Sequence, residues 1–259
     1  MAVEYVEYLE SVGVRIVPLI YHGDIQRNFE LLRHINGLVI PGGKKNAEYG
    51  RFVSQIYQEV KEMNDRGNYF PIWGIGMGAL ELLNEEVAPG YELLVERSMQ
   101  AERVPLEFTK PPEESRMWGY IGKKAYNFTL NNFTYFETSL GVDPAQVRHV
   151  NSLSKMFEVT AITYDKYGFP MVAAFESERY PFYGTTFLPQ TAGYSYHPDV
   201  KADHSYLSVQ FNRYCAEHFV LEVKTNLNAF DTYGEEVWNM VENRKVVLIN
   251  EKLQEVYLF

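Results

Sequence analysis

Two glycine-rich segments each end an apolar run typical of a buried strand, and they are the first places where chemistry is expected. The sequence PGG occupies 41–43, and WGIGMG occupies 73–78. Open α/β proteins bind ligands at the carboxyl ends of their parallel strands. The second segment also has the strand, turn and helix order of an elbow that lifts a nucleophile above a sheet. We therefore expect Gly42, Gly43, Gly76 and Met77 to frame a ligand pocket, with a plain tight turn as the alternative for Gly42 and Gly43.

Other potential nucleophiles are isolated. Cys215 is the only cysteine of the chain, and it lies in a long helical pattern, so we expect it to pack in the core. Ser98 and Ser115 are available hydroxyls, but the sequence between His34 and His149 contains no histidine that would activate them. Nucleophilic catalysis needs such a base within about 3 Å. These residues therefore do not predict a catalytic site.

A histidine and aspartate loop at 197–204 is the one candidate for metal binding. Its polar members are His197, Asp199, Asp203 and His204. The spacing matches no helical i, i+4 pair of ligands. We interpret the segment as a polar loop and expect neither a metal site nor a cofactor.

Predicted helices and strands alternate along the first third of the chain, and these elements must position the two glycine segments. Apolar periodicity predicts helices over 3–12, 26–34 and 49–63 and strands over 14–20, 37–40 and 70–76. Strands separated by helices indicate βαβ units and a parallel sheet.

The second half of the chain follows a different pattern. The runs 157–165 and 170–177 with the turn 166–168 predict an antiparallel hairpin, and a strand over 183–188 and a helix over about 203–223 follow. We expect one α/β domain over 1–223 and a C-terminal extension over 224–259.

Composition excludes several classes of protein. The chain has 259 residues, with 24 Lys and Arg against 34 Asp and Glu, and a formal net charge of −10. A single cysteine excludes an internal disulfide and a cysteine-based zinc site. An acidic chain without a basic run lacks the electrostatic footprint of a nucleic-acid binder. No apolar run approaches the ~18–20 residues that span a bilayer, so we expect neither a nucleic-acid partner nor a direct membrane span.

Five segments together resemble the γ-glutamyl hydrolase family, which belongs to the class I glutamine amidotransferase-like superfamily. They are YVEYLESVGVRIVPL (5–19), INGLVIPGG (35–43), GNYFPIWGIGMGALELL (67–83), ESRMW (114–118) and ERYPFYGTTFLPQ (178–190). The resemblance implies a flavodoxin-like three-layer α/β sandwich with a mostly parallel central sheet, an antiparallel hairpin in the second half and a C-terminal extension. It also implies removal of glutamates from folylpolyglutamates by a cysteine and histidine pair.

The chain departs from the family pattern at the positions that carry this chemistry. The family elbow resembles W-G-T-C-x-G, and Gly76 stands where the nucleophilic cysteine would be. The second signature resembles Y-P-x-Y-G-x-Q-W-H-P-E, with Leu188 at the histidine position and Gln190 at the carboxylate position. Loss of a triad member costs several powers of ten in rate. We therefore expect no enzyme, but a structural or accessory subunit of a larger complex.

Two alternatives remain open. One is a pseudoenzyme that binds a glutamate-like or folate-like ligand in the pocket framed by the glycines. The other is a residual or repurposed hydrolase that uses Thr185 or Thr186 as its nucleophile.

The two ends of the chain favour protein partners. Family members begin with an apolar strand resembling P-x-I-G-I, whereas this sequence starts within the following helix. A sheet without that strand exposes an unpaired edge. The run 246–249, a strand from a partner or a preceding segment are the candidates to cover it. We expect other protein subunits to bind through 1–12 and 224–259.

The cellular location stays undetermined. An intracellular or organellar assembly, including a mitochondrial one, is favoured, and the lysosomal or secreted location of the family is the alternative. Asn127 and Asn132 begin glycosylation sequons, which have meaning only in the secretory pathway.

Overall fold

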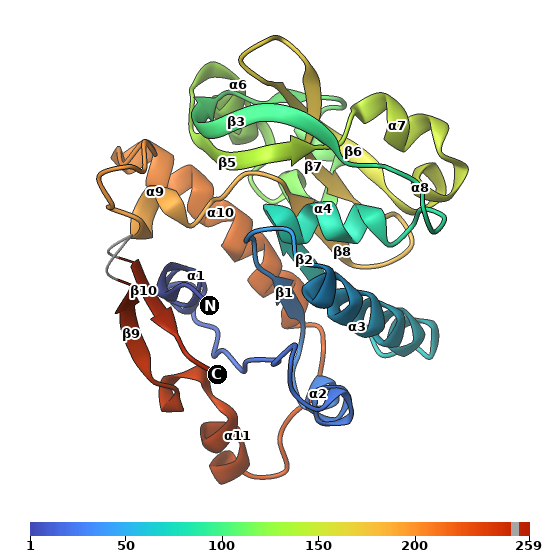
Figure 1. Cartoon of the computed structure of the whole chain (residues 1–259), viewed down its shortest axis with the longest axis vertical. Helices are drawn as coiled ribbons and strands as arrows, with labels where there is room; N and C mark the ends of the chain where they lie inside the picture. The colour runs from blue at the N-terminus through green and yellow to red at the C-terminus, as the bar shows by residue number, and fades with distance from the viewer. Residues whose placement is uncertain (250–253) are drawn as a thin grey trace.

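A six-stranded mixed sheet forms the centre of the computed structural model, which describes residues 1–249 and 254–259 (Figure 1). The strand order is β1-β2-β8-β7-β6-β4. The first three strands are parallel, and the others pair antiparallel. Their bounds are β1 Leu38–Ile40, β2 Ile72–Ile75, β8 Phe182–Thr185, β7 Pro170–Glu176, β6 Glu158–Tyr164 and β4 Glu107–Phe108.

Helices cover both faces of this sheet and give two hydrophobic cores. One core packs α1 and α10 against the face that carries Trp73 and Ile75. The other packs α3, α4, α7 and α8 against the face that carries Ile72, because successive side chains of a strand point to opposite faces. The expected three-layer α/β fold is thereby confirmed. The helices are α1 Val3–Glu10, α3 Ala47–Asp65, α4 Met77–Asn84, α7 Pro144–His149, α8 Asn151–Met156 and α10 Tyr206–Val223.

Smaller elements fill the connections. A second sheet consists of the antiparallel strands β3 and β5. The remaining elements are α2 Ile25–Leu32, β3 Val95–Val104, η1 Pro112–Glu114, α5 Arg116–Gly119, η2 Gly122–Tyr126, α6 Asn127–Leu130, β5 Thr134–Gly141, α9 Thr191–Tyr194, α11 Tyr233–Asn239, η3 Val241–Asn243, β9 Val246–Ile249 and β10 Gln254–Tyr257.

Local sequence signals account for several element boundaries. The Asp24 carboxylate accepts a hydrogen bond from the Gln26 N–H at 3.0 Å and caps α2, as its position before an apolar pattern predicts. The hairpin of β6 and β7 is confirmed, and Gly168 takes the positive φ of 83° that its turn needs. Cys215 is buried in the core beneath α10, as expected.

The predicted strand over 14–20 is wrong. These residues belong to no strand, although they are apolar. Some of their backbone groups are bound by other partners: Ile16 C=O accepts from the Val241 N–H at 2.9 Å, and Ile20 N–H donates to Asn28 Oδ1 at 3.0 Å. A strand needs a neighbouring strand to form its ladder, and none of the described residues supplies one here.

The C-terminal run does not complete the central sheet, so one of the three candidates for its open edge is wrong. β9 pairs with β10 in a separate two-stranded sheet. β10 also lies against the start of the chain, where the Tyr257 N–H donates to Met1 C=O at 2.8 Å. The two termini consequently lie near each other beside α1 (Figure 1). The division at residue 223 stays a prediction.

Candidate functional site

Gly76 forms a sharp turn between β2 and α4. Its φ of 58° and ψ of −121° fall in a region that glycine adopts readily and side-chain-bearing residues adopt only with strain. The Gly76 N–H donates to Thr185 C=O at 2.8 Å, which fixes the turn to the end of β8. Gly78, two residues further on, is equally necessary, because a Cβ there would clash with the Ile40 carbonyl oxygen. The elbow geometry expected from the sequence is therefore present.

The structure brings two of the three departing positions together. A Cβ on Gly76 would lie 2.7 Å from Leu188 Cδ2. Leu188 follows β8, and its N–H donates to Tyr135 C=O at 2.8 Å. Gln190 is also buried and turns toward α1, where its Nε2 donates to Glu4 Oε1 at 3.3 Å. Its Oε1 has no hydrogen-bond partner among the described residues.

Tyr5 occupies the other side of the elbow and is not among the residues expected there from the sequence. Its hydroxyl oxygen accepts a hydrogen bond from the Gly42 N–H at 3.0 Å. Burial raises the pKa of Tyr5 above its usual value, so the hydroxyl is neutral. The only available signal was the helical periodicity of 3–12, which indicates a core residue rather than a contact with the pocket.

The glycine turn after β1 borders open space. A Cβ on Gly43 would meet no atom within 4 Å. Gly43, Gly76 and Met77 all line one cavity of about 1950 Å³. Met77 begins α4, so its N–H has no partner within the helix. The cavity thus borders the first turn of α4 beside the elbow, and residue 76 has no side chain that could act as a nucleophile.

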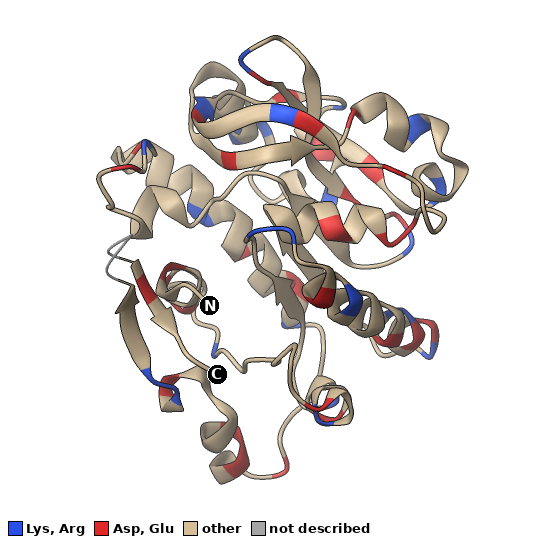
Figure 2. Ribbon diagram, in the orientation of Figure 1, with Lys and Arg blue, Asp and Glu red and all other residues tan. Residues whose placement is uncertain are grey.

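The loop after Gly43 adds positive charge to the same cavity. Lys44 and Lys45 line it and are exposed. Figure 2 shows the basic colour in this loop between β1 and α3. Two adjacent lysines after a glycine turn are a visible signal in the sequence, although they were not among the residues that we expected at the pocket.

The alternative nucleophiles are engaged elsewhere. Thr186 Oγ1 donates to Val172 C=O at 2.6 Å, and Thr185 Oγ1 accepts from Trp73 Nε1 at 3.3 Å. Both threonines are buried. Cys215 is buried as well, and burial raises the pKa of its thiol well above the usual range. A neutral, enclosed thiol is a poor nucleophile.

The His and Asp side chains of the loop 197–204 have different contact partners. His204 Nδ1 contacts Ala192 C=O at 2.9 Å, and His197 Nδ1 lies 3.6 Å from Asp199 Oδ2. Within the described part of the chain, no three His, Cys, Asp or Glu side chains gather as a metal site would require.

Two further findings concern the surface. Among residues 1–249 and 254–259, no helix is long and apolar enough to cross a membrane. Asn132 is exposed, whereas the Asn127 amide donates to Lys124 C=O at 2.8 Å. Glycosylation at these two positions stays a prediction.

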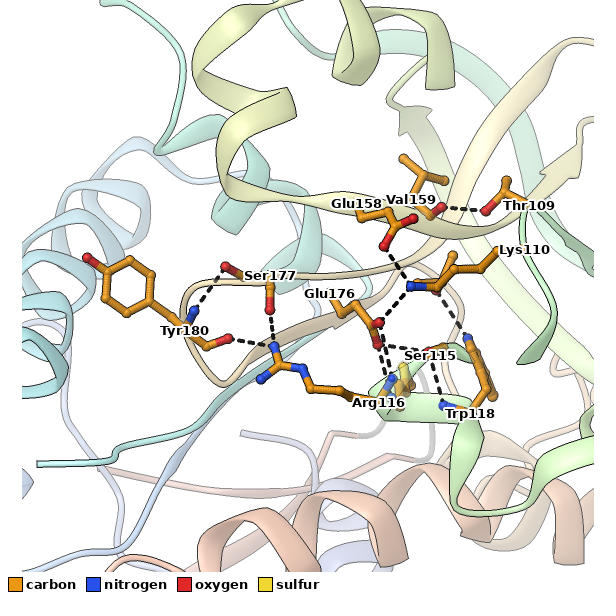
Figure 3. Close-up of polar contacts among 12 residues, drawn as sticks. Thr109, Lys110, Ser115, Arg116, Trp118, Glu158, Val159, Glu176, Ser177 and Tyr180 are labelled. Carbon is orange, nitrogen blue, oxygen red and sulfur yellow. Dashed lines mark hydrogen bonds and ion pairs between the residues drawn. The ribbon is translucent and has the colours of Figure 1, made fainter. Parts of the chain in front are cut away.

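A polar cluster gathers around the end of β7 (Figure 3). Glu176, at the end of β7, accepts hydrogen bonds from Ser115 Oγ at 2.8 Å and from the Met117 N–H at 3.0 Å, and Lys110 Nζ lies 3.1 Å from it. Burial raises the pKa of Glu176, but these donors and the Lys110 charge hold that pKa below its usual value. The cluster pins the segment 114–118 to the sheet.

The fold and the elbow define an α/β protein of the class I glutamine amidotransferase-like type. A putative GMP synthase protein from Thermoplasma acidophilum has a similar structure, with a TM-score of 0.54 and 17% identity over 86% of this chain and 87% of that one. The human γ-glutamyl hydrolase is 32% identical over 245 residues, which are 91% of this chain and 74% of the human protein. The chain therefore belongs to the γ-glutamyl hydrolase family.

Other relatives agree with this assignment. The mouse γ-glutamyl hydrolase is 28% identical over all of this chain and 83% of its own length. γ-Glutamyl hydrolase B of Dictyostelium discoideum is 28% identical over 88% of this chain and 67% of its own length. No family model matches the sequence.

These relatives correct one expectation from the sequence. The substitutions at Gly76, Leu188 and Gln190 led us to expect that the chain is not an enzyme. The curated relatives are named as hydrolases, so membership in their family points to an enzyme. The three substitutions describe which side chains stand at the elbow, and they are not evidence of lost activity.

Proposed function

We propose that this chain binds γ-glutamyl compounds at the elbow, in the cavity between Gly43 and Met77. The observation that carries the proposal is the elbow itself. Gly76 holds the sharp turn at the end of β2, and the first N–H groups of α4 lie beside it. Helix N-termini and glycine turns favour negatively charged oxygen atoms. The relatives are named for the γ-glutamyl group, which carries such oxygens.

The charge of the cavity supports an anionic ligand. A γ-glutamyl compound bears at least one free carboxylate, and Lys44 and Lys45 stand where the ligand would enter. The whole chain carries a net charge of −10, so an anion gains attraction only where such cations are concentrated.

Calorimetry of the full chain with a γ-glutamyl peptide tests the proposal. We expect saturable binding that weakens about tenfold when Lys44→Glu and Lys45→Glu are combined, since each exposed charge pair contributes up to about 1 kcal/mol. The matched control is Lys123→Glu with Lys124→Glu, a second pair of adjacent exposed lysines that does not line the cavity. Absence of heat and of a thermal shift with the unaltered protein would contradict the proposal. Glutamate release is measured in the same samples, because the family points to an enzyme.

We also propose a role as a subunit of a protein complex, which a separate observation favours. The C-terminal segment exposes large apolar side chains, among them Trp238 at 79% and Leu258 at 49%. Large aromatic and apolar side chains anchor many protein interfaces.

Native mass measurement in gentle cell extracts tests this second role. We expect the tagged chain in a complex that dissociates with Trp238→Ser and Leu258→Ser, but not with Tyr167→Ser and Phe169→Ser, two exposed aromatic residues of the β6–β7 turn. A lone monomer in such extracts would argue against a subunit role.

A further inference from the structure

Glu4 is a carboxylate on the wall of the cavity beside the elbow, and it has no cationic partner. It lies in the first turn of α1 and lines this cavity together with Tyr5. None of the ion pairs among the described residues includes it. Burial raises the pKa of Glu4, hydrogen bonds from the Ser195 and Gln190 side chains oppose this, and the like charge of Glu7 adds to it. The ionised carboxylate is therefore poorly solvated, and a cation beside it would stabilise it.

Contacts of the neighbouring residues place Glu4 next to the elbow. The following residue in α1 is Tyr5, whose hydroxyl accepts the Gly42 N–H at 3.0 Å. Gln190, whose amide donates to Glu4, comes two residues after Leu188, the side chain that reaches over the elbow glycine. Glu4 therefore stands on the α1 side of the proposed γ-glutamyl site.

A second hydrogen-bond acceptor accompanies this carboxylate. Gln190 is fully buried, and its Nε2 donates to Glu4 Oε1 at 3.3 Å. Gln190 Oε1 has no hydrogen-bond partner among the described residues. Because both atoms belong to one amide group, this unpaired oxygen also lies near Glu4. A buried acceptor without a donor destabilises the fold, so the two side chains together call for a group with positive charge and several donors.

An ammonium group fits this pair of acceptors better than a metal ion does. It carries one positive charge and up to three N–H donors. Calcium and magnesium ions take about six or more oxygen ligands. Within residues 1–249 and 254–259, no three His, Cys, Asp or Glu side chains gather as such an ion would require. A γ-glutamyl group with a free α-amino group carries an ammonium of this kind.

We propose that Glu4 and Gln190 bind the α-ammonium group of the ligand, so that the site selects γ-glutamyl compounds whose α-amino group is free. This inference rests on the proposed function, which places a carboxylate of the ligand between Gly43 and Met77. The α-carboxylate and the α-ammonium group are attached to one carbon atom, so they need an anion site and a cation site side by side. A compound whose α-nitrogen is acylated has no charge there and leaves the Glu4 carboxylate unpaired.

Two matched ligands test this selectivity. γ-Glutamylalanine and glutarylalanine both have two carboxylates and differ only in the α-amino group, which glutarylalanine lacks. The second ligand is the smaller one, so a loss of affinity cannot come from a steric clash. Calorimetry of the full chain at neutral pH measures both dissociation constants. We expect γ-glutamylalanine to bind about tenfold more tightly, because a hydrogen bond between two charged groups in a buried site contributes about that much.

A variant of Glu4 tests the same contact from the protein side. Glu4→Gln keeps the size of the side chain and removes its charge. It is expected to weaken the binding of γ-glutamylalanine about tenfold without weakening that of glutarylalanine, so that the selectivity is lost. Glu92→Gln is the control, because Glu92 is exposed and does not line the cavity, and it should keep the selectivity. Thermal melts confirm that each variant is folded.

Three results would overturn the inference, and they separate it from the proposed function. Equal affinity of the unaltered protein for the two ligands would overturn the inference alone, because the site would then bind the γ-glutamyl carboxylate without the ammonium group. A selectivity that survives Glu4→Gln would also overturn it, since another group would bind the ammonium. Absence of binding by both ligands would overturn the proposed function and this inference with it.

Discussion

Leu188 Cδ2 lies 2.7 Å from the point where a side chain on Gly76 would begin. These two residues follow neighbouring parallel strands, β2 and β8, whose carboxyl ends meet at the same edge of the sheet. The pair therefore has the closeness that a nucleophile and its base need, although neither residue has a reactive group. A substitution that restores both groups must change both residues, because a new side chain at 76 meets Leu188.

The double substitution Gly76→Cys and Leu188→His is expected to raise hydrolysis of a γ-glutamyl peptide by about 10²-fold over the unaltered protein, since a positioned base contributes about that much. Positive φ at residue 76 costs the cysteine about 1–2 kcal/mol of folding stability. Glutamate release measures the rate. Each single substitution is the control and should gain less than a tenth of that effect, and a double variant no faster than the singles would contradict the prediction.

Substitution of Tyr5 by phenylalanine is expected to strengthen γ-glutamyl binding. The Tyr5 hydroxyl accepts the Gly42 N–H, so its removal frees one donor of the pocket for the ligand. One neutral hydrogen bond corresponds to about fivefold to tenfold in the dissociation constant. Calorimetry checks this. Tyr8→Phe is the matched control in the same helix, because Tyr8 donates at 2.7 Å to Asn212 C=O in the core; it should lower stability without changing affinity.

The Glu176 cluster is expected to make the fold sensitive to acid (Figure 3). Hydrogen bonds and Lys110 lower the pKa of Glu176 in the folded state. The stabilisation is therefore complete above the unfolded pKa near 4.5 and is lost as the pH falls through the lower folded value. Glu176→Gln should cost about 3 kcal/mol of unfolding free energy at pH 7 and reduce the loss of stability below pH 4.5.

Urea denaturation at pH 7 and at lower pH checks the prediction for Glu176. Glu158→Gln is the control, since Glu158 contacts the same Lys110 at 2.6 Å but its side chain is 41% exposed. It should cost less than about 1 kcal/mol. Equal losses of unfolding free energy in both variants would mean that burial of the Glu176 cluster does not determine its contribution to stability.

His218 is expected to set the pH dependence of stability at milder acidity. Burial lowers the pKa of His218 to about 4, and Glu222, Glu176 and Arg116 add smaller effects. The unfolded chain binds a proton near pH 6.5 while the folded one does not until about pH 4, so stability falls as the pH decreases across this range. Below about pH 4 both the folded and the unfolded chain carry the proton, so His218 causes no further change in stability. The slope is at most about 1.4 kcal/mol per pH unit.

The variant His218→Phe should flatten the stability profile between pH 6.5 and 4. The His218 ring contacts the Tyr183 ring at a centroid distance of 4.7 Å, and phenylalanine keeps that packing. Thermal melts across this range measure the profile. His22→Ala, at an exposed position, is the control. An unchanged slope in the His218 variant would show that other groups control this region of pH.

Much of the fold could be predicted because its signals are local. The cap at Asp24, the turn at Gly168 and the elbow at Gly76 each depend on conformational preferences of a few neighbouring residues. The segment 14–20 was not predictable in this way. Its apolar pattern is that of a buried strand, but strand formation depends on a partner at the β1 edge, and no described residue provides that partner.

The sequence by itself determined the family resemblance and the residues present at the elbow, because motif spacing and residue type are written in the chain. It did not determine that Tyr5 takes the Gly42 N–H, that Lys44 and Lys45 line the same cavity, or that Leu188 reaches over Gly76. Those relationships join segments that are distant along the chain. Only the tertiary structure decided them, because the parallel pairing of β1, β2 and β8 brings their carboxyl ends to one edge.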